Sequence, residues 1–134
     1  MELHLKIIGV LLFTLAFIHV AFPKYFNWKR ELSLVSLINR QMMYVHTLFI
    51  AVVVFLMGFL CFTSANDLIT TSLGKKVSLG LAVFWAARLF VQFVGYSSKL
   101  WRGKTFETIV HVLFSMLWMY LSIVFWLIYR MNNA

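Results

Sequence analysis

The sequence predicts an all-α membrane protein, a bundle of four transmembrane helices with a short interfacial amphipathic segment between the first and second helices. Hydrophobic residues make up 63% of the 134 residues and charged residues only 12%. Soluble domains contain about 45–50% and about 25%, respectively. Four apolar stretches also reach the length of about 17–25 residues that a helix needs to cross a bilayer. Most of this chain is therefore expected to lie in lipid.

The four predicted spans cover residues of about 5–22, 42–62, 77–96 and 109–129, and we expect one integral membrane domain over residues 1–134. Pro23 directly follows the first span, and it predicts the end of that helix because proline lacks the backbone N–H. The second connection, residues 63–76, is polar, and we expect it to be flexible. The single cysteine, Cys61, excludes a disulfide within the chain.

The first connection, between the first and second spans, is long, basic and aromatic. Leu32, Val35 and Ile38 recur there at helical spacing, which predicts a short helix lying in the membrane interface. Trp101, in the third connection, is expected to anchor the chain at the same interface. These two connections face the same side of the membrane if all four spans cross it.

The basic residues predict the orientation. Positive charges are more frequent in cytoplasmic loops than in external ones. The first and third connections carry Lys24, Lys29, Arg30, Arg40, Lys99, Arg102 and Lys104, whereas the opposite side carries Lys6, Lys75, Lys76 and Arg130. We therefore expect these two connections in the cytoplasm and both termini outside, in a bacterial inner membrane. The net charge of +8 then points to contact with lipid headgroups and not with nucleic acid.

The polar residues of the third and fourth spans fall on one face of each helix. Each residue turns the helix by about 100°, so positions three, four and seven apart share a face. One such face carries Trp85, Arg88, Gln92 and Tyr96, and the other carries Glu107, His111, Ser115, Trp118 and Ser122. We expect these faces to point inward, away from lipid.

Arg88 is the strongest indication of function. An arginine at the centre of a bilayer costs at least about 2.5–3.5 kcal/mol, so its charge needs a partner. The chain contains only four carboxylates, Glu2, Glu31, Asp67 and Glu107, and none is expected at the depth of Arg88. An anionic ligand would match the guanidinium group. The sequence thus predicts a pocket for an anionic amphiphile, such as a lipid, a quinone-like compound or an isoprenoid.

Histidines from three spans are expected at a similar depth on the cytoplasmic side. An imidazole titrates near neutral pH, so His46 and His111 are the candidate catalytic residues for proton transfer on a bound ligand. Whether the protein is an enzyme stays undecided at this stage. The remaining candidate ligand-binding residues are Arg88, Gln92, Arg40, Gln41, His19, Trp85, Tyr96 and Glu107.

Two alternatives remain open. Two histidines on different helices can ligate one haem iron, so a haem b protein with His46 and His111 as the axial ligands is the first. The second is an accessory subunit or assembly factor of a larger membrane complex, or a homo-oligomer. Apart from the haem pair, no metal ligands are predicted, and the cofactor stays unknown, with haem b as one possibility. No phosphate-binding loop, nucleophile elbow or metalloprotease motif is present.

Overall fold

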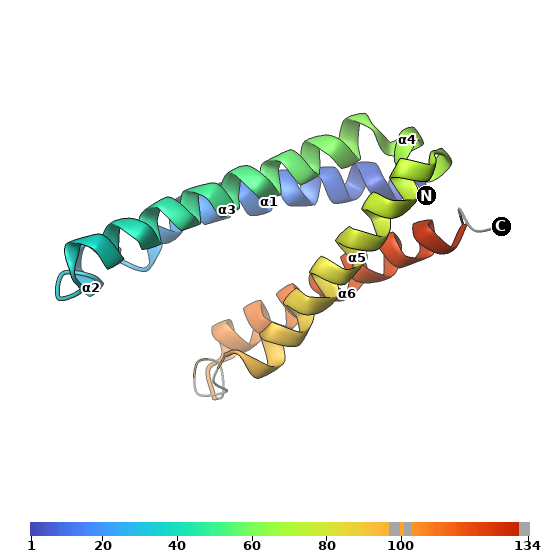
Figure 1. The fold of residues 1–134 in the computed structure, drawn as a ribbon. Coiled ribbons are helices and arrows are strands. Elements are labelled where there is room, and N and C mark those ends of the chain that lie inside the picture. Colours follow the sequence, from blue (N-terminus) through green and yellow to red (C-terminus); the bar gives the residue numbers. More distant parts are fainter. Residues whose placement is uncertain (97–99, 101–102, 132–134) are drawn as a thin grey trace. The chain divides into compact units, whose positions relative to one another are not determined.

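The computed structural model describes residues 1–96, 100 and 103–131, and this part of the chain is helical, without strands. Trp101, Lys99 and Arg102 lie outside the described residues. The helices, in chain order, are α1 (Glu2–Tyr25), α2 (Trp28–Glu31), α3 (Leu37–Thr63), α4 (Ala65–Thr70), α5 (Ser72–Val94) and α6 (Thr105–Met131) (Figure 1).

Four of these helices, α1, α3, α5 and α6, are long and apolar enough to cross a membrane, among the described residues. The predicted all-α membrane fold with four spanning helices is therefore confirmed. Each of the first, second and fourth helices extends by several residues beyond its predicted span, because flanking polar residues continue the same helix. The third helix is shifted toward the N-terminus, so that Tyr96 lies just beyond its last residue, Val94.

The helices form two compact units. An N-terminal unit, Glu2–Ala65, holds α1 and α3 packed side by side, and a C-terminal unit that begins at Asn66 holds α5 packed against α6 (Figure 1). Each pair is a helical hairpin whose two long helices run along most of their length together. That the two hairpins make up a single domain stays a prediction.

Small residues let α1 and α3 approach closely. A Cβ atom added at Gly9 would lie 2.9 Å from the backbone oxygen of Gly58, and one added at Gly58 would lie 2.9 Å from the oxygen of Gly9. The crossing is flanked by aromatic contacts, with the Phe13 and Phe55 ring centroids 4.8 Å apart. Close backbone approach of this kind favours helix association in lipid, where apolar burial alone gives little driving force.

The end of α1 corrects one prediction. Pro23 does not stop the helix but lies inside its last turn, and α1 continues to Tyr25. Proline cannot donate to the His19 backbone oxygen four residues earlier, but its fixed φ is close to the helical value, so the helix can continue for two more residues. The chain then turns at Asn27, which adopts a left-handed conformation with φ 54°, a conformation that asparagine tolerates better than most residues.

The short helix predicted from the spacing of Leu32, Val35 and Ile38 does not form at those residues. The first connection instead contains α2, a single helical turn that ends at Glu31, and Ile38 belongs to α3. Trp28 fixes this turn, because it is buried and its ring packs edge-on against Tyr44 of α3, with centroids 5.3 Å apart. The location of this connection in the membrane interface stays a prediction.

The second connection, which the sequence led us to expect as a flexible segment, is helical. It contains α4, where Ala65 and Leu68 are buried, and α5 already begins at Ser72. The Thr71 hydroxyl accepts a hydrogen bond from the Gly74 backbone N–H at 2.9 Å, which caps the first turn of α5.

Candidate functional site

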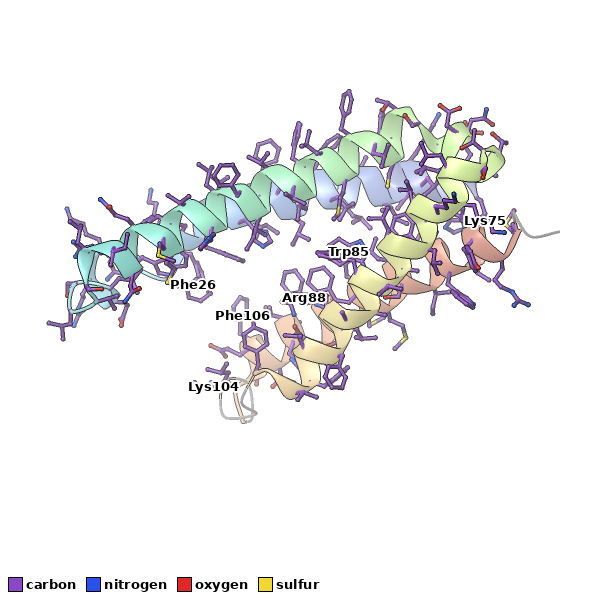
Figure 2. All side chains as sticks on the ribbon, in the orientation of Figure 1. Phe26, Lys75, Trp85, Arg88, Lys104 and Phe106 are labelled. Carbon is purple, nitrogen blue, oxygen red and sulfur yellow. The ribbon has the colours of Figure 1, made fainter. Side chains whose placement is uncertain are left out.

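The C-terminal unit brings together most of the polar residues that the sequence placed on two inward faces. Figure 2 shows Trp85 and Arg88 along α5, one turn apart. Gln92 follows a turn later and is buried, with 8% of its surface exposed. From α6, His111 meets Gln92, and Trp118 meets Arg88. Five side chains thus form a continuous row across the α5–α6 hairpin, which we call the Arg88 row: Trp85, Arg88, Gln92, His111 and Trp118.

The hydrogen bonds of the Arg88 row run in one direction. An Arg88 guanidinium nitrogen, Nη1, donates to Oε1 of Gln92 at 3.3 Å. Because a guanidinium can only donate, the amide atom of Gln92 that faces Arg88 must be the oxygen, which accepts this bond. The amide nitrogen Nε2 then faces Nδ1 of His111 at 3.0 Å. An amide NH₂ has no acceptor, so Nε2 donates and the His111 Nδ1 accepts.

The same order fixes the tautomer of His111. A neutral imidazole carries one proton, and an Nδ1 atom that accepts a hydrogen bond has none, so the proton lies on Nε2. The ring is held in place by Phe93, whose ring meets it edge-on with centroids 5.7 Å apart. The Ser115 hydroxyl donates to the His111 backbone oxygen at 2.8 Å and so turns away from the imidazole.

Aromatic rings surround the Arg88 guanidinium. Its central carbon lies 5.0 Å from the Trp118 ring centroid and 5.6 Å from that of Tyr96. Tyr96 is eight residues further along the chain, about 12 Å away at 1.5 Å per residue. The two side chains close this distance by pointing toward each other, so the guanidinium lies nearer the C-terminal end of α5 than its backbone position suggested.

The contacts of Arg88 leave its charge without an opposite charge. Gln92, Trp118 and Tyr96 are neutral, and no carboxylate lies within ion-pair distance of Arg88 in the part of the chain that the structure describes. Glu107, which was predicted to line the pocket, is exposed on the first turn of α6. Cation–π contacts offset part of the cost of burying the charge, by about 0.5–2 kcal/mol each.

The indole N–H groups of Trp85 and Trp118, near the Arg88 guanidinium, have no hydrogen-bond acceptor among the described residues. The Trp85 and Trp118 rings are stacked, with centroids 5.2 Å apart and planes inclined by 8°. Their exposed fractions are only 2% and 3%, and neither Nε1 atom has a hydrogen-bond partner within the described residues. Buried tryptophan N–H groups normally find a partner, so these two are unsatisfied donors next to Arg88.

The other predicted site residues lie in the N-terminal unit, and their meeting with Arg88 stays a prediction. They are His19, Arg40, Gln41 and His46. Nδ1 of His19 lies 2.9 Å from the Leu15 backbone oxygen, which only accepts, so this nitrogen carries a proton. Gln41 and His46 are exposed, and His46 lies about 160° around α3 from Tyr44, which faces α1.

The haem alternative gains no support from the geometry of His111. A histidine that ligates a metal usually donates its second ring N–H to an acceptor. Here Nδ1 of His111 accepts from Gln92, and the Gln92 oxygen is already bonded to Arg88. The pairing of His46 with His111 stays a prediction, since the two residues lie in different units. No group of three or more histidine, cysteine or acidic residues could hold a metal ion among the described residues.

Trp118 is the site residue that the sequence reasoning did not select. It stands on the predicted inward face of α6, seven residues after His111, but tryptophans on such faces are most often packing residues. The signal was its register. Trp118 follows His111 by seven residues and Trp85 precedes Gln92 by seven, so an antiparallel hairpin that pairs Gln92 with His111 also pairs Trp85 with Trp118, one turn from Arg88. Comparison of the chain with models of protein families, with curated proteins and with solved structures found no match.

Proposed function

We propose that the Arg88 row binds the anionic head of a hydrophobic ligand within the membrane, such as a lipid, a quinone-like compound or an isoprenoid. The observation that carries this proposal is the uncompensated charge of Arg88, whose three neighbours are all neutral. Intramembrane arginines are rare and costly, and they usually serve a ligand, an ion or a partner. A guanidinium group matches a carboxylate or a phosphate with two parallel hydrogen bonds.

The chemistry of the row supports an acceptor-only ligand. Arg88 has guanidinium N–H groups beyond the one bonded to Gln92, and two buried indole N–H groups lie alongside. The Gln92 oxygen already accepts from Arg88, and Nδ1 of His111 already accepts from Gln92. The row therefore presents hydrogen-bond donors to a ligand. A ligand whose head carries oxygen acceptors fits it, whereas an amine or a cation does not.

Binding rather than catalysis is the function that we propose. A general base needs a lone pair within reach of the proton that it removes, and the Nδ1 lone pair of His111 is used by Gln92. His111 is then a residue that positions the row. Proton transfer by His46, with its exposed ring, stays a prediction of the sequence.

The membrane setting completes the proposal. We place the protein in a bacterial inner membrane, with the first and third connections in the cytoplasm and both termini outside, on the strength of the charge asymmetry. Membrane lipids are its surroundings and a source of the ligand. If the protein is instead an accessory subunit or an assembly factor, its partner is a larger membrane complex or a second copy of the chain.

A brominated fatty acid tests the proposal, because bromine quenches tryptophan fluorescence at contact. The protein in detergent is titrated with a brominated long-chain carboxylate and, separately, with the corresponding alcohol. We expect saturable quenching by the carboxylate alone. The affinity for the carboxylate should fall at least about tenfold in Arg88→Gln, since a charge-assisted hydrogen bond contributes about 1.5–3 kcal/mol. The quenching should also decrease in amplitude in Trp118→Phe.

The matched control is Arg130→Gln, which removes a charge near the other end of the hairpin. It should bind as the unchanged protein does. Equal quenching by the carboxylate and the alcohol, or full affinity in Arg88→Gln, would contradict an anion site at Arg88. An absorbance spectrum of the same sample, before and after reduction, decides the haem alternative, since haem gives a Soret band that shifts on reduction.

A further inference from the structure

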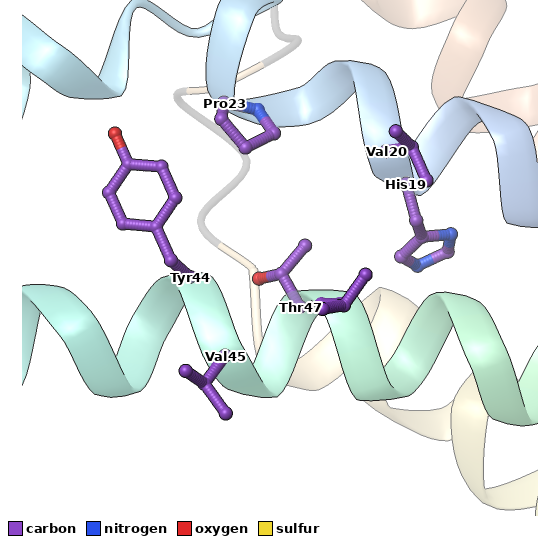
Figure 3. Close-up of a pocket in the computed structure, with 7 residues that line it drawn as sticks. His19, Val20, Pro23, Tyr44, Val45 and Thr47 are labelled. Atoms are coloured by element: carbon purple, nitrogen blue, oxygen red, sulfur yellow. The ribbon is translucent and has the colours of Figure 1, made fainter.

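We propose that the groove between α1 and α3 binds one anionic phospholipid, with an acyl chain in the groove and the phosphate at its basic mouth. This second site lies entirely in the N-terminal unit and does not depend on the Arg88 row. The groove has a volume of about 300 Å³ and is lined by His19, Val20, Pro23, Tyr44, Val45, Thr47 and Leu48. Figure 3 shows Tyr44 and Thr47 projecting from α3 toward α1, and His19 projecting from α1 toward α3.

The groove is open and largely apolar, as an acyl chain requires. Aliphatic side chains of Val20, Val45 and Leu48 form much of its lining, together with the ring of Pro23. Transfer of methylene groups from water to such a surface is favourable, but in a bilayer the gain over bulk lipid comes only from shape and polar contacts. The specificity must therefore come from the groups at its mouth.

Four cations gather at that mouth. Arg40 stands one helical turn before Tyr44 on the same face of α3, and Lys24 directly follows Pro23 in α1. Lys29 and Arg30 belong to α2, which the packing of Trp28 on Tyr44 places beside the groove. The four residues therefore lie in the chain near the end of the groove that Pro23 and Tyr44 form.

These cations have no counter-ion within the described residues. Glu31 is the single acidic residue in the first connection, between residues 24 and 40, and none of the four cations forms an ion pair in the described part of the chain. A phosphate group at this position would neutralise a surplus of positive charge that the protein itself leaves in place. Each basic residue near a membrane surface favours an anionic lipid by about fivefold.

Polar groups inside the mouth suit the ester region of a phospholipid. The hydroxyls of Tyr44 and Thr47 have no hydrogen-bond partner among the described residues. Both can donate to an ester carbonyl, which accepts only. Along the groove the basic residues come first and Tyr44 next, which is the order of phosphate and ester in a phospholipid, and Thr47, His19 and the aliphatic side chains lie further along.

Native mass spectrometry of the detergent-purified protein tests this site. The protein is mixed with phosphatidylglycerol or with phosphatidylcholine that carries the same acyl chains. We count the bound lipid in Arg88→Gln, to which the other substitutions are added, so that a lipid at the Arg88 row is left out. We expect phosphatidylglycerol to bind this variant at one-to-one stoichiometry and to be preferred by at least about fivefold. Arg40→Gln should lower the preference by a similar factor. Thr47→Trp, which fills the groove, should abolish the bound lipid while leaving the helical circular dichroism unchanged.

Two control variants show whether the bound lipid occupies this groove. Val53→Trp adds the same side chain at an exposed position of α3 and should keep the lipid. Arg88→Gln should also keep it, so that failure of the Arg88 proposal and failure of this one give different results. The proposal is overturned if the two lipids bind equally, or if glycerol phosphate displaces the lipid at the same concentration as an added phospholipid. It is equally overturned if folded Thr47→Trp, combined with Arg88→Gln, binds phosphatidylglycerol as Arg88→Gln alone does.

Discussion

Gln92 in α5 and His111 in α6 are joined by a hydrogen bond between Nε2 and Nδ1, 3.0 Å apart, that ties the two helices of the C-terminal unit together. Removing it with Gln92→Leu leaves both the Arg88 guanidinium and Nδ1 of His111 without this partner. We expect the free energy of unfolding to decrease by about 1–3 kcal/mol. Unfolding by sodium dodecyl sulfate in mixed micelles, followed by circular dichroism, measures the change.

Gln92→Glu is the informative companion variant. It places a carboxylate beside Arg88, with nearly the same shape as the amide, so the charge of the arginine gains an internal counter-ion. We expect the variant to be at least as stable as the unchanged protein and to lose the brominated carboxylate. A variant that keeps full affinity for that ligand would argue against Arg88 as its binding group.

Two histidines are expected in opposite tautomers. Nδ1 of His19 faces a backbone oxygen and carries the proton, whereas Nδ1 of His111 accepts from Gln92, which leaves the proton on Nε2. Nitrogen NMR of histidine-labelled protein above neutral pH distinguishes the two forms by their chemical shifts. His111→Ala assigns one set of signals. A protonated Nδ1 at His111 would reverse the direction of the hydrogen bonds in the Arg88 row.

The crossing of α1 and α3 should tolerate no larger residue at Gly9. In Gly9→Val the new side chain meets the Gly58 backbone oxygen and the Phe62 Cβ, each 2.9 Å from the position of the added Cβ. We expect a loss of about 1–3 kcal/mol in the free energy of unfolding. Gly80→Ala is the control, because a Cβ there meets nothing within 4 Å. That variant should be neutral or slightly stabilised, as alanine favours a helix over glycine.

The orientation can be tested with single cysteines in a Cys61→Ser background. Ser33 lies in the first connection and Asn66 in the second, and both are exposed. If both termini are outside, a membrane-impermeant maleimide applied to intact cells labels Asn66→Cys and spares Ser33→Cys until the cells are opened. The opposite pattern would invert the assignment and place the first connection outside.

The helices were predictable because their signal is local. Long apolar runs in α1, α3, α5 and α6 leave the backbone no other way to satisfy its hydrogen bonds in lipid. The shorter features depended on tertiary contacts instead. Leu68 of α4 is buried although most of the second connection is polar. Pro23 lies within the last turn of α1 instead of directly after its end. Neither fact can be read from residue type.

The candidate site was predictable in part for the same reason. Helical periodicity placed Arg88, Gln92 and His111 on facing sides of two consecutive spans, and a short connection makes such spans neighbours. Periodicity does not reveal the direction of a side chain along its helix. The approach of Arg88 to Tyr96, and its position over Trp118, therefore appeared only with the three-dimensional structure.

The direction of the hydrogen bonds from Arg88 through Gln92 to His111 has a consequence for the response to acidity. A row of donors distinguishes an ionised acid from its protonated form, because the protonated form brings a hydrogen that finds no acceptor. Arginine stays charged throughout the physiological range. The acidity of the captured molecule would then contribute to setting the pH at which it is released.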